Sequence, residues 1–234
     1  MYEIKKYGFK ISNLYSILID NIAVFSDLHI GYEGVLRMEG AMIPKYQKKV
    51  IKKRIEEIIR RYNPDKIVIN GDFKHEFGKN LKQEWNEVSE LLDFLVKKLE
   101  VIIVRGNHDN FIKTIAKKFN VEVKDEYEYG EIKFVHGHKE ANGDKIVIGH
   151  EHPSLVIRDK VGVVAKLPCF LISKEMVVLP AMSPLASGTD VSSASNEEYL
   201  SPILKSYDVD VMEIYAISDE LMHFSSVGKI KRVI

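Results

Sequence analysis

The residues of this sequence that could perform chemistry gather in five short polar clusters, each directly after an apolar run. Seven of the eight histidines lie in or next to these clusters. The clusters are Asp27-Leu28-His29, Gly71-Asp72, Gly106-Asn107-His108-Asp109, His136-Gly137-His138 and Gly149-His150-Glu151-His152. Imidazole, carboxylate and amide ligands without a thiolate favour Mn, Fe, Zn, Co or Ni over softer metals. With this many donors, two ions bridged by one carboxylate are the economical arrangement.

Each cluster, taken singly, also has a simpler explanation. In an extended segment Asp27 points the same way as His29 and could hold a metal with it, but an Asp that caps a helix beside an incidental His is an alternative. The tetrad at 106–109 could be an ordinary turn, in which Gly106 supplies backbone angles that a side chain would forbid. Because histidines and carboxylates recur at five strand ends, we expect the clusters to share one centre.

The elements that must position these clusters alternate between strand and helix in the first half of the chain. Apolar runs predict strands at residues 22–26, 66–70 and 101–104. Helical periodicity predicts one helix that begins at Pro44 and another over residues 85–99. This order implies parallel pairing with right-handed crossovers, and ligands of such sheets lie at the carboxyl ends of the strands.

The second half of the chain predicts closely spaced strands, whose short connections favour hairpins. After a short helix that ends near residue 118, the predicted strands are residues 121–123, 132–135, 145–148, 155–157, 161–165, 169–172, 176–179, 211–217 and 221–225. A long loop rich in Ser, Gly and Pro is predicted at 183–206, with one helical turn near 197–200. That loop could line a pocket, contact another subunit or be mobile. No second-domain boundary is visible, so residues 1–234 are predicted to form one domain.

The composition excludes some partners without selecting one. Lys+Arg and Asp+Glu balance at 34 each, so the overall charge does not point to nucleic acid or to a membrane surface. The most basic stretch, at 45–61, is interrupted by Glu56 and Glu57 and is interpreted as a solvated helix face. A single cysteine, Cys169, indicates a reducing compartment. We see no signal peptide and no uncharged run near the ~20 residues that span a bilayer, so a cytoplasmic protein without a membrane partner is expected.

The ordered series of clusters resembles the motifs of the calcineurin-like metallophosphoesterases. The similarity covers roughly residues 22–152 and includes every motif in order. Within that superfamily, residues 27–33 and 71–77 resemble a compact archaeal group related to double-strand-break-repair nucleases and to bacterial ligase-associated phosphoesterases. The resemblance implies an α/β fold, a four-layer α-β-β-α sandwich of two mixed sheets flanked by helices.

The resemblance also implies a ligand set for two divalent ions. The ligands would be Asp27, His29, Asp72 and His152 for one ion, and Asp72, Asn107, His136 and His150 for the other. Asp72 would be the carboxylate that bridges the two ions. Manganese is the preferred metal, with Ni, Fe, Co or Zn as alternatives.

Roles for the remaining polar residues follow from the same resemblance. His108 would approach the phosphate and the leaving group, and Asp109 would orient His108. His138 would lie behind a ligand or face the substrate, and His75 would buttress Asp72. Asn107 and Arg105 are further candidates for contact with the substrate.

The expected activity is hydrolysis of a phosphodiester. Two divalent ions, two carboxylates and a bridging hydroxide sum to about +1, a charge that attracts phosphate and lowers the pKa of the water toward ~7. We therefore expect a dinuclear metal-dependent phosphodiesterase that cleaves nucleotides or nucleic acid with a metal-bridged hydroxide. A phosphomonoesterase is the enzymatic alternative, with Arg105 and Lys74 as its candidate cations. A non-catalytic protein-binding scaffold on the same fold is the alternative of a different class, and assembly into a homo-oligomer is compatible with the sequence.

Overall fold

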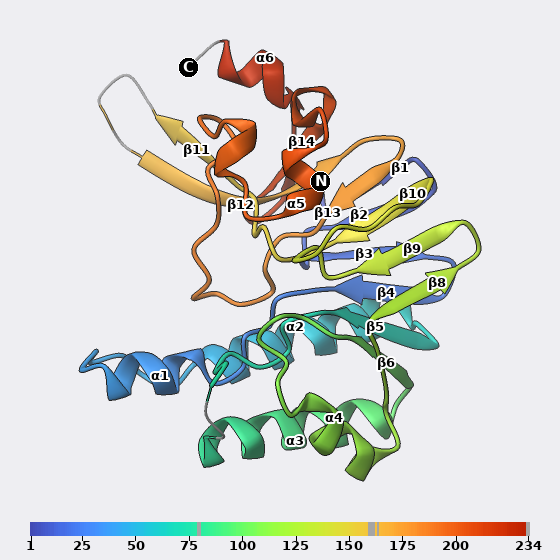
Figure 1. Cartoon of the computed structure of the whole chain (residues 1–234), viewed down its shortest axis with the longest axis vertical. Helices are drawn as coiled ribbons and strands as arrows, with labels where there is room; N and C mark the ends of the chain where they lie inside the picture. The colour runs from blue at the N-terminus through green and yellow to red at the C-terminus, as the bar shows by residue number, and fades with distance from the viewer. Residues whose placement is uncertain (79–80, 159–161, 163, 233–234) are drawn as a thin grey trace.

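Two mixed β-sheets stacked face to face form the centre of the protein (Figure 1). The computed structural model describes residues 1–78, 81–158, 162 and 164–232. Helices lie on the outer side of each sheet, so the layers follow the order α-β-β-α (Figure 1). This is the four-layer sandwich expected from the sequence.

The first sheet has seven strands within the described residues. From one edge to the other they are β1 (Glu3–Lys6), β2 (Phe9–Ser12), β3 (Ser16–Ile19), β4 (Ile22–Phe25), β5 (Lys66–Asn70), β6 (Glu100–Val104) and β7 (Glu122–Lys124). Strands β1 to β4 pair antiparallel, whereas β4 to β7 are parallel neighbours. The parallel half confirms the predicted crossovers. Strands β1 and β2 were not predicted, because lysines and a glycine interrupt their apolar pattern and only Phe9 and Ile11 are buried apolar residues.

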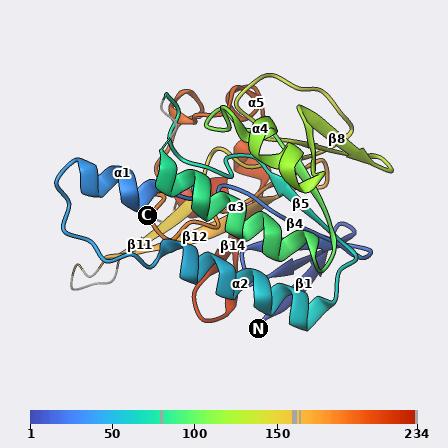
Figure 2. The same ribbon diagram turned by 90° about the horizontal axis from the view of Figure 1, so that it is seen from below.

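Helices cover the outer face of the first sheet, where α2 (Gln47–Tyr62) and α3 (Lys82–Val96) run side by side (Figure 2). The short helices α4 (Ile112–Ala116) and η1 (Lys117–Phe119) follow β6. Helix α2 buries Ile51, Ile55 and Ile58, the spacing of one helical face, and each such side chain contributes roughly 1.5–3 kcal/mol of burial. The helix begins at Gln47 rather than at Pro44, and α1 (Tyr32–Met38) was not predicted.

The second sheet has eight strands in the part of the chain that the structure describes. In order they are β15 (Leu221–Ser226), β14 (Glu213–Ile217), β12 (Val164–Ile172), β13 (Met176–Val178), β10 (Lys145–Ile148), β9 (Ile132–Val135) and β8 (Glu126–Tyr129), with β11 (Ser154–Arg158) paired to β12. The predicted strands 161–165 and 169–172 fall on the single strand β12, although residues 161 and 163 lie outside the described residues.

The prediction of hairpins is wrong for the pairing of β9, β10 and β13 with one another. Strands β9, β10 and β13 are parallel neighbours, because the segments between them carry the chain back to the same end of the sheet. Hairpins do form between β12 and β13 and between β14 and β15.

Short helices cover the outer face of the second sheet. They are η2 (Asn196–Glu198), α5 (Pro202–Lys205), η3 (Val209–Val211) and α6 (Val227–Lys231). The predicted loop at 183–206 therefore contains two helical segments, since Tyr199, Ile203 and Leu204 are buried against this sheet. Among the described helices, none combines the length and the apolar character that a membrane crossing requires.

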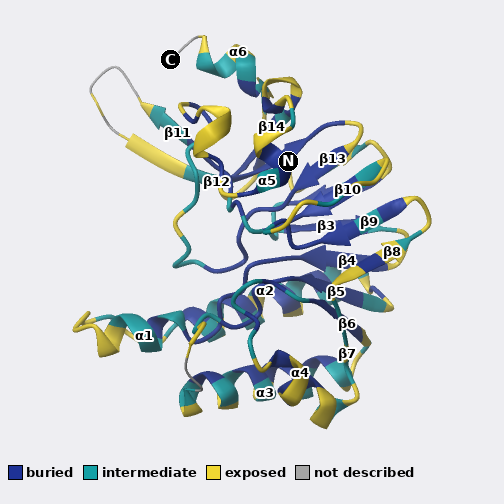
Figure 3. Ribbon diagram, in the orientation of Figure 1, coloured by how far each residue is buried: buried dark blue, intermediate teal, exposed yellow. Residues whose placement is uncertain are grey.

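The side-chain amide of Asn70 joins the two sheets in the interior. The strands are the most deeply buried elements (Figure 3), and apolar side chains of both sheets pack between them. At the end of β5, Asn70 Nδ2 donates to Val135 O at 2.9 Å and to Val147 O at 3.1 Å, both in the second sheet. Asn70 is fully buried, so both hydrogen bonds are made away from water.

We expect Asn70→Ala to lower the free energy of unfolding by roughly 2–5 kcal/mol, since each buried acceptor left without its donor costs about 1–3 kcal/mol. Chemical denaturation measures the change. Asn142→Ala, in an exposed loop, is the control and should stay within about 0.5 kcal/mol of the parent. Equal effects of the two substitutions would contradict the role given to Asn70.

Candidate metal centre

The five polar clusters meet where the carboxyl ends of two sets of parallel strands face each other. Strands β4, β5 and β6 of the first sheet lead into the clusters at Asp27, Asp72 and Asn107. Strands β9 and β10 of the second sheet lead into those at His136 and His150. The clusters therefore share one centre, as the sequence predicted, and the centre lies at the seam between the sheets.

One group of possible metal ligands contains Asp27, His29 and His152, whose donor atoms all lie within 4.8 Å of one another. His152 Nε2 is 3.1 Å from Asp27 Oδ1 and 3.3 Å from His29 Nε2. Asp27 is completely buried. Three donors thus face a common point at the end of β4.

The second group contains Asp72, His136 and His150, again within 4.8 Å. His136 Nε2 lies 3.2 Å from Asp72 Oδ2 and 3.2 Å from Asn107 Oδ1. The same carboxylate oxygen of Asp72 is 3.8 Å from His29 Nε2, a member of the first group. Asp72 is consequently the residue that lies between the two groups.

Backbone carbonyls orient two of the histidines. His136 Nδ1 lies 3.1 Å from Asn70 O, and His152 Nδ1 lies 3.4 Å from Ser187 O. A carbonyl can only accept, so each Nδ1 carries a proton, and each Nε2 is the ring atom that would be the ligand when a metal is bound.

The ligand residues converge through an unusual backbone conformation. Left-handed φ angles occur at Asp27 (57°), His29 (45°), Asp72 (47°), His150 (66°) and His152 (49°). The sequence suggested that Asp27 and His29 lie on the same side of an extended strand. This is wrong, because β4 ends at Phe25 and both residues have left-handed φ angles. Non-glycine residues in this region cost about 1–3 kcal/mol each, a strain that clusters at functional sites.

Glycines of the motifs make room for the ligands. A Cβ on Gly106 would overlap the Oδ1 and backbone N of Asp72, and one on Gly149 would lie 2.6 Å from Asp27 Oδ2. Gly106 is not among the residues with positive φ, so the expectation that it supplies special backbone angles is wrong. It is needed instead because Asp72 packs directly against it.

Burial and charge act in opposition at the two carboxylates. Burial alone would raise the pKa of Asp27 and of Asp72, but the imidazoles of His152 and His136 respectively hold both pKa values below the usual range. For His136, burial opposes the charged form, yet Asp72 raises the pKa to about 9. Burial lowers the pKa of His29 to about 3 and that of His150 to about 4.

This donor set fits divalent metal ions. In the described part of the chain, the ion-pair partners of Asp27 and Asp72 are histidines, not lysine or arginine. Two buried carboxylates without a fixed cation need positive charge from elsewhere, and His29 and His150, held neutral, are in the form that binds metals. The residues that would hold the ions are therefore Asp27, His29, Asp72, Asn107, His136, His150 and His152.

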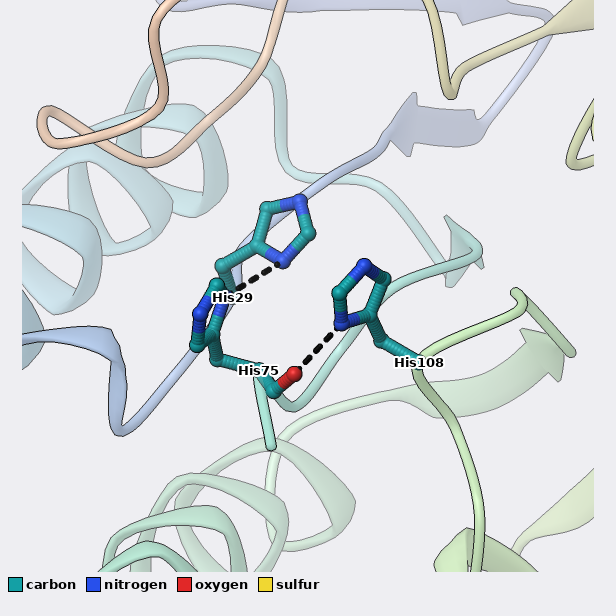
Figure 4. Close-up of side chains that lie close together, drawn as sticks. All are labelled: His29, His75 and His108. Carbon is teal, nitrogen blue, oxygen red and sulfur yellow. Dashed lines mark hydrogen bonds between the residues drawn. The ribbon is translucent and has the colours of Figure 1, made fainter. Parts of the chain in front are cut away.

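His108 belongs to a further group beside the centre, with His29 and His75 (Figure 4). His108 Nδ1 lies 2.5 Å from the His75 carbonyl oxygen, and His75 Nδ1 lies 3.2 Å from His29 Nδ1. His75 thus supports His29 rather than Asp72, and its carbonyl, rather than Asp109, orients the His108 ring.

Asp109 has a different position from the one expected. Its carboxylate accepts backbone N–H groups of Gly106 at 2.9 Å, Phe73 at 2.9 Å and Lys74 at 3.2 Å. Burial, with the negative charge of Asp72, raises the pKa of Asp109 to about 6. Asp109 therefore ties the turn after β6 to the turn after β5, and acts on His108 only through that backbone.

Two candidates for substrate contact lie on the side of His136. Arg105 and His138 line a cavity of about 180 Å³ with His136, and Arg105 also pairs with Asp125 at 3.8 Å. His138 Nδ1 is buried without a hydrogen-bond partner among the described residues.

Two buried acids that support the site were missed by the sequence reasoning. Glu84 Oε1 accepts the N–H groups of His75 at 2.8 Å and Glu76 at 2.7 Å, and Glu84 pairs with Lys74 at 3.5 Å. Lys74, which was predicted to bind a monoester, is thereby paired with a buried acid instead. Glu151 accepts the N–H of Ser201 at 2.9 Å and so anchors the 183–206 segment. The position of Glu84 beside the apolar face of α3 was the sequence signal that could have predicted its burial.

The fold and this donor set together define a phosphoesterase metal centre, and comparison with known proteins agrees. The family model for calcineurin-like phosphoesterases matches residues 21–215. The chain therefore belongs to the calcineurin-like phosphoesterase family and is a metal-dependent phosphoesterase.

Two solved structures resemble the chain to different extents. The nuclease MPE of Pseudomonas putida superposes with a TM-score of 0.71 at 19% identity, covering 95% of this chain and 98% of that one. YfcE, a phosphoesterase from E. coli, matches with a TM-score of 0.40 at 16% identity, covering 72% and 83%. No curated protein sequence matches the chain.

We expect Gly106→Ala to displace Asp72 and to reduce bound metal at least tenfold, because the new methyl group overlaps the carboxylate. Elemental analysis of the purified protein after dialysis against MnCl₂ measures the metal. Gly34→Ala is the matched control, since its Cβ would lie 3.6 Å from Gln83 in ordinary contact. Normal metal content in the Gly106 variant would show that Asp72 is not a ligand.

Proposed function

We propose that this phosphoesterase is a dinuclear phosphodiesterase that acts on nucleotides or nucleic acid. The observation that carries the proposal is the position of Asp72, whose Oδ2 lies 3.2 Å from His136 and 3.8 Å from His29, between two complete donor groups. A single ion would need only one of these groups. Manganese is the preferred metal, because carboxylate, amide and imidazole ligands without thiolate suit it.

Two bound ions would activate a water molecule and stabilise charge on the phosphoryl oxygens. The chain's own residues then hold and complete this arrangement. The His136 and His152 rings are fixed by backbone carbonyls, and Asn107 adds a neutral oxygen beside His136. A site fixed in this way loses little energy to rearrangement when charge develops on the substrate.

His108 is the proposed group that meets the leaving oxygen. Its Nδ1 contacts the His75 carbonyl, so Nε2 of the doubly protonated ring is the atom that would give its proton to the leaving oxygen. The ring is half-buried, so the substrate can reach it. A general acid of this kind contributes about 10²–10⁴-fold in rate.

The two cations predicted to bind a monoester, Lys74 and Arg105, are both paired with acids, which favours a diester. A monoester carries two negative charges, and its recognition needs free cations beside the metals. Lys74 pairs with the buried Glu84, and Arg105 pairs with Asp125. A diester carries one charge and needs less compensation. The name of the P. putida nuclease, whose fold spans 95% of this chain, adds nucleic acid to the substrates worth testing.

A non-catalytic scaffold fits the site less well. Every member of the expected ligand set lies at the centre, and a protein-binding surface would not require five strained ligand residues. A single domain over residues 1–234 and a cytoplasmic location stay predictions.

We expect His108→Ala to keep its metal and to lose about 10²–10⁴-fold in kcat, since only proton transfer is removed. Asp72→Ala should lose metal as well as activity. Turnover of a nucleotide diester and elemental analysis give the two readouts, with His223→Ala, on the distant β15, as control. Full metal occupancy in Asp72→Ala would refute its bridging position.

We expect hydrolysis of bis-p-nitrophenyl phosphate to exceed that of p-nitrophenyl phosphate at least tenfold in kcat/KM. The panel is run with Mn, Ni, Fe, Co and Zn added singly, and includes single-stranded DNA and cyclic nucleotides. A preference for the monoester would indicate that the protein is a phosphomonoesterase. Inactivity with every metal despite bound ions would indicate a non-catalytic scaffold.

A further inference from the structure

A cavity of about 310 Å³ lies beside His152, on the opposite flank of the centre from Arg105. Five parts of the chain form it: Tyr15 before β3, Arg54 of α2, the segment at 152–154, Lys166 on β12, and the segment at 181–188. His152 belongs both to the cavity wall and to the first ligand group. The cavity therefore adjoins the proposed metal centre through the His152 side chain.

The wall at 181–188 is attached to the ligands themselves. Met182 N donates to Ser26 O at 2.9 Å, and Ser183 N donates to Asp27 O at 3.0 Å. A Cβ on Gly188 would overlap the His152 carbonyl, so this glycine lets the segment pass close over the ligand. The first part of the predicted loop thus lines a pocket, one of the three roles that the sequence left open.

Two cations face this cavity. The Arg54 guanidinium stacks over the Tyr15 ring at 3.8 Å, and Nη1 donates to Met182 O at 2.6 Å. A guanidinium has five N–H donors, so this contact fixes its orientation and leaves donors for a ligand. Lys166 Nζ donates to Gly188 O at 2.5 Å and is otherwise exposed. The described residues of the lining include no aspartate or glutamate.

The cavity on the other flank has no such excess of positive charge. Arg105 and Lys139 line it together with Asp125, Glu126 and Glu140. The two flanks of the centre therefore differ in sign, in a protein whose overall charge is zero. An anionic substituent of a substrate would be attracted to the side of His152 only.

We propose that this cavity, here called the Arg54–Lys166 pocket, binds the phosphate that neighbours the scissile phosphodiester, together with part of its sugar. The inference rests on the proposed function and makes it narrower: the preferred substrate carries a second phosphate one nucleotide away. The volume lies near the lower end of about 300–1,000 Å³ for ligand pockets, which suits a fragment of a nucleotide chain. Arg54 and Lys166 are specificity residues in this scheme, while the metal ligands carry the reaction.

Binding to the metal-free protein tests the pocket without relying on turnover. Fluorescence anisotropy of a 5′-fluorescein-labelled oligothymidylate measures the Kd as a function of salt. We expect Lys166→Glu to weaken binding about tenfold and to reduce the slope of log K against log salt by about one. Lys174→Glu is the matched control, because it makes the same charge change at an exposed lysine just beyond the other end of β12.

A second variant protects the test against a local effect of Lys166. Arg54→Gln removes the charge and keeps a shorter polar side chain with N–H donors. It should weaken the same binding about tenfold, with an unchanged melting temperature as the check on folding. Equal Kd values for Lys166→Glu and Lys174→Glu overturn the proposal, as does parent-like binding by Arg54→Gln.

Competition and kinetics show whether the pocket binds the neighbouring phosphate of a nucleotide chain or any phosphate. Thymidine 3′,5′-bisphosphate should displace the labelled strand at least tenfold better than thymidine 5′-monophosphate if the neighbouring phosphate is what binds. In the metal-loaded enzyme, Lys166→Glu should raise KM for a dinucleotide with a terminal phosphate about tenfold and leave KM for bis-p-nitrophenyl phosphate unchanged. If no phosphoester is hydrolysed, the proposed function is wrong. The binding result on metal-free protein still shows whether the Arg54–Lys166 pocket binds phosphate.

Discussion

The carboxylates of Asp27 and Asp72 are buried at the seam of two sheets without a fixed cation, and the rest of the structure is arranged around that fact. Isolated buried carboxylates are costly, so four imidazoles and an amide surround them and the strand ends of both sheets converge there. The amide of Asn70 holds the sheets together next to this point, and its carbonyl holds His136. One residue therefore connects the packing of the sandwich with the orientation of a ligand.

The sequence allowed the prediction of much of this arrangement, because the relevant signals are local. Apolar runs followed directly by Asp, Asn or His mark β4, β5, β6, β9 and β10, and parallel strands bring such ends together. The side-by-side parallel order of β9, β10 and β13 was missed, since short connections give no sign of the path that the chain takes between strands. Long-range pairing has no local signature.

Contacts made by the backbone were also beyond prediction. The role given to Asp109 followed from its position next to His108, but its side chain turns to the N–H groups of Gly106 and Phe73, and a carbonyl orients the imidazole instead. Gly106 was expected to be glycine because of its backbone angles, whereas the structure requires a glycine there because Asp72 packs directly against it. In both cases the deciding partner is far away in sequence, and residue type alone does not reveal it.

At the five expected ligands with left-handed φ angles, the residue type that best fits the backbone differs from the residue type that can bind a metal. Glycine and asparagine adopt these angles most readily, yet the positions hold aspartate and histidine because only those side chains suit the metal. The centre is thus a frustrated region, retained for its activity at the expense of stability. Glycine at these positions would relieve the backbone but would remove the proposed ligands.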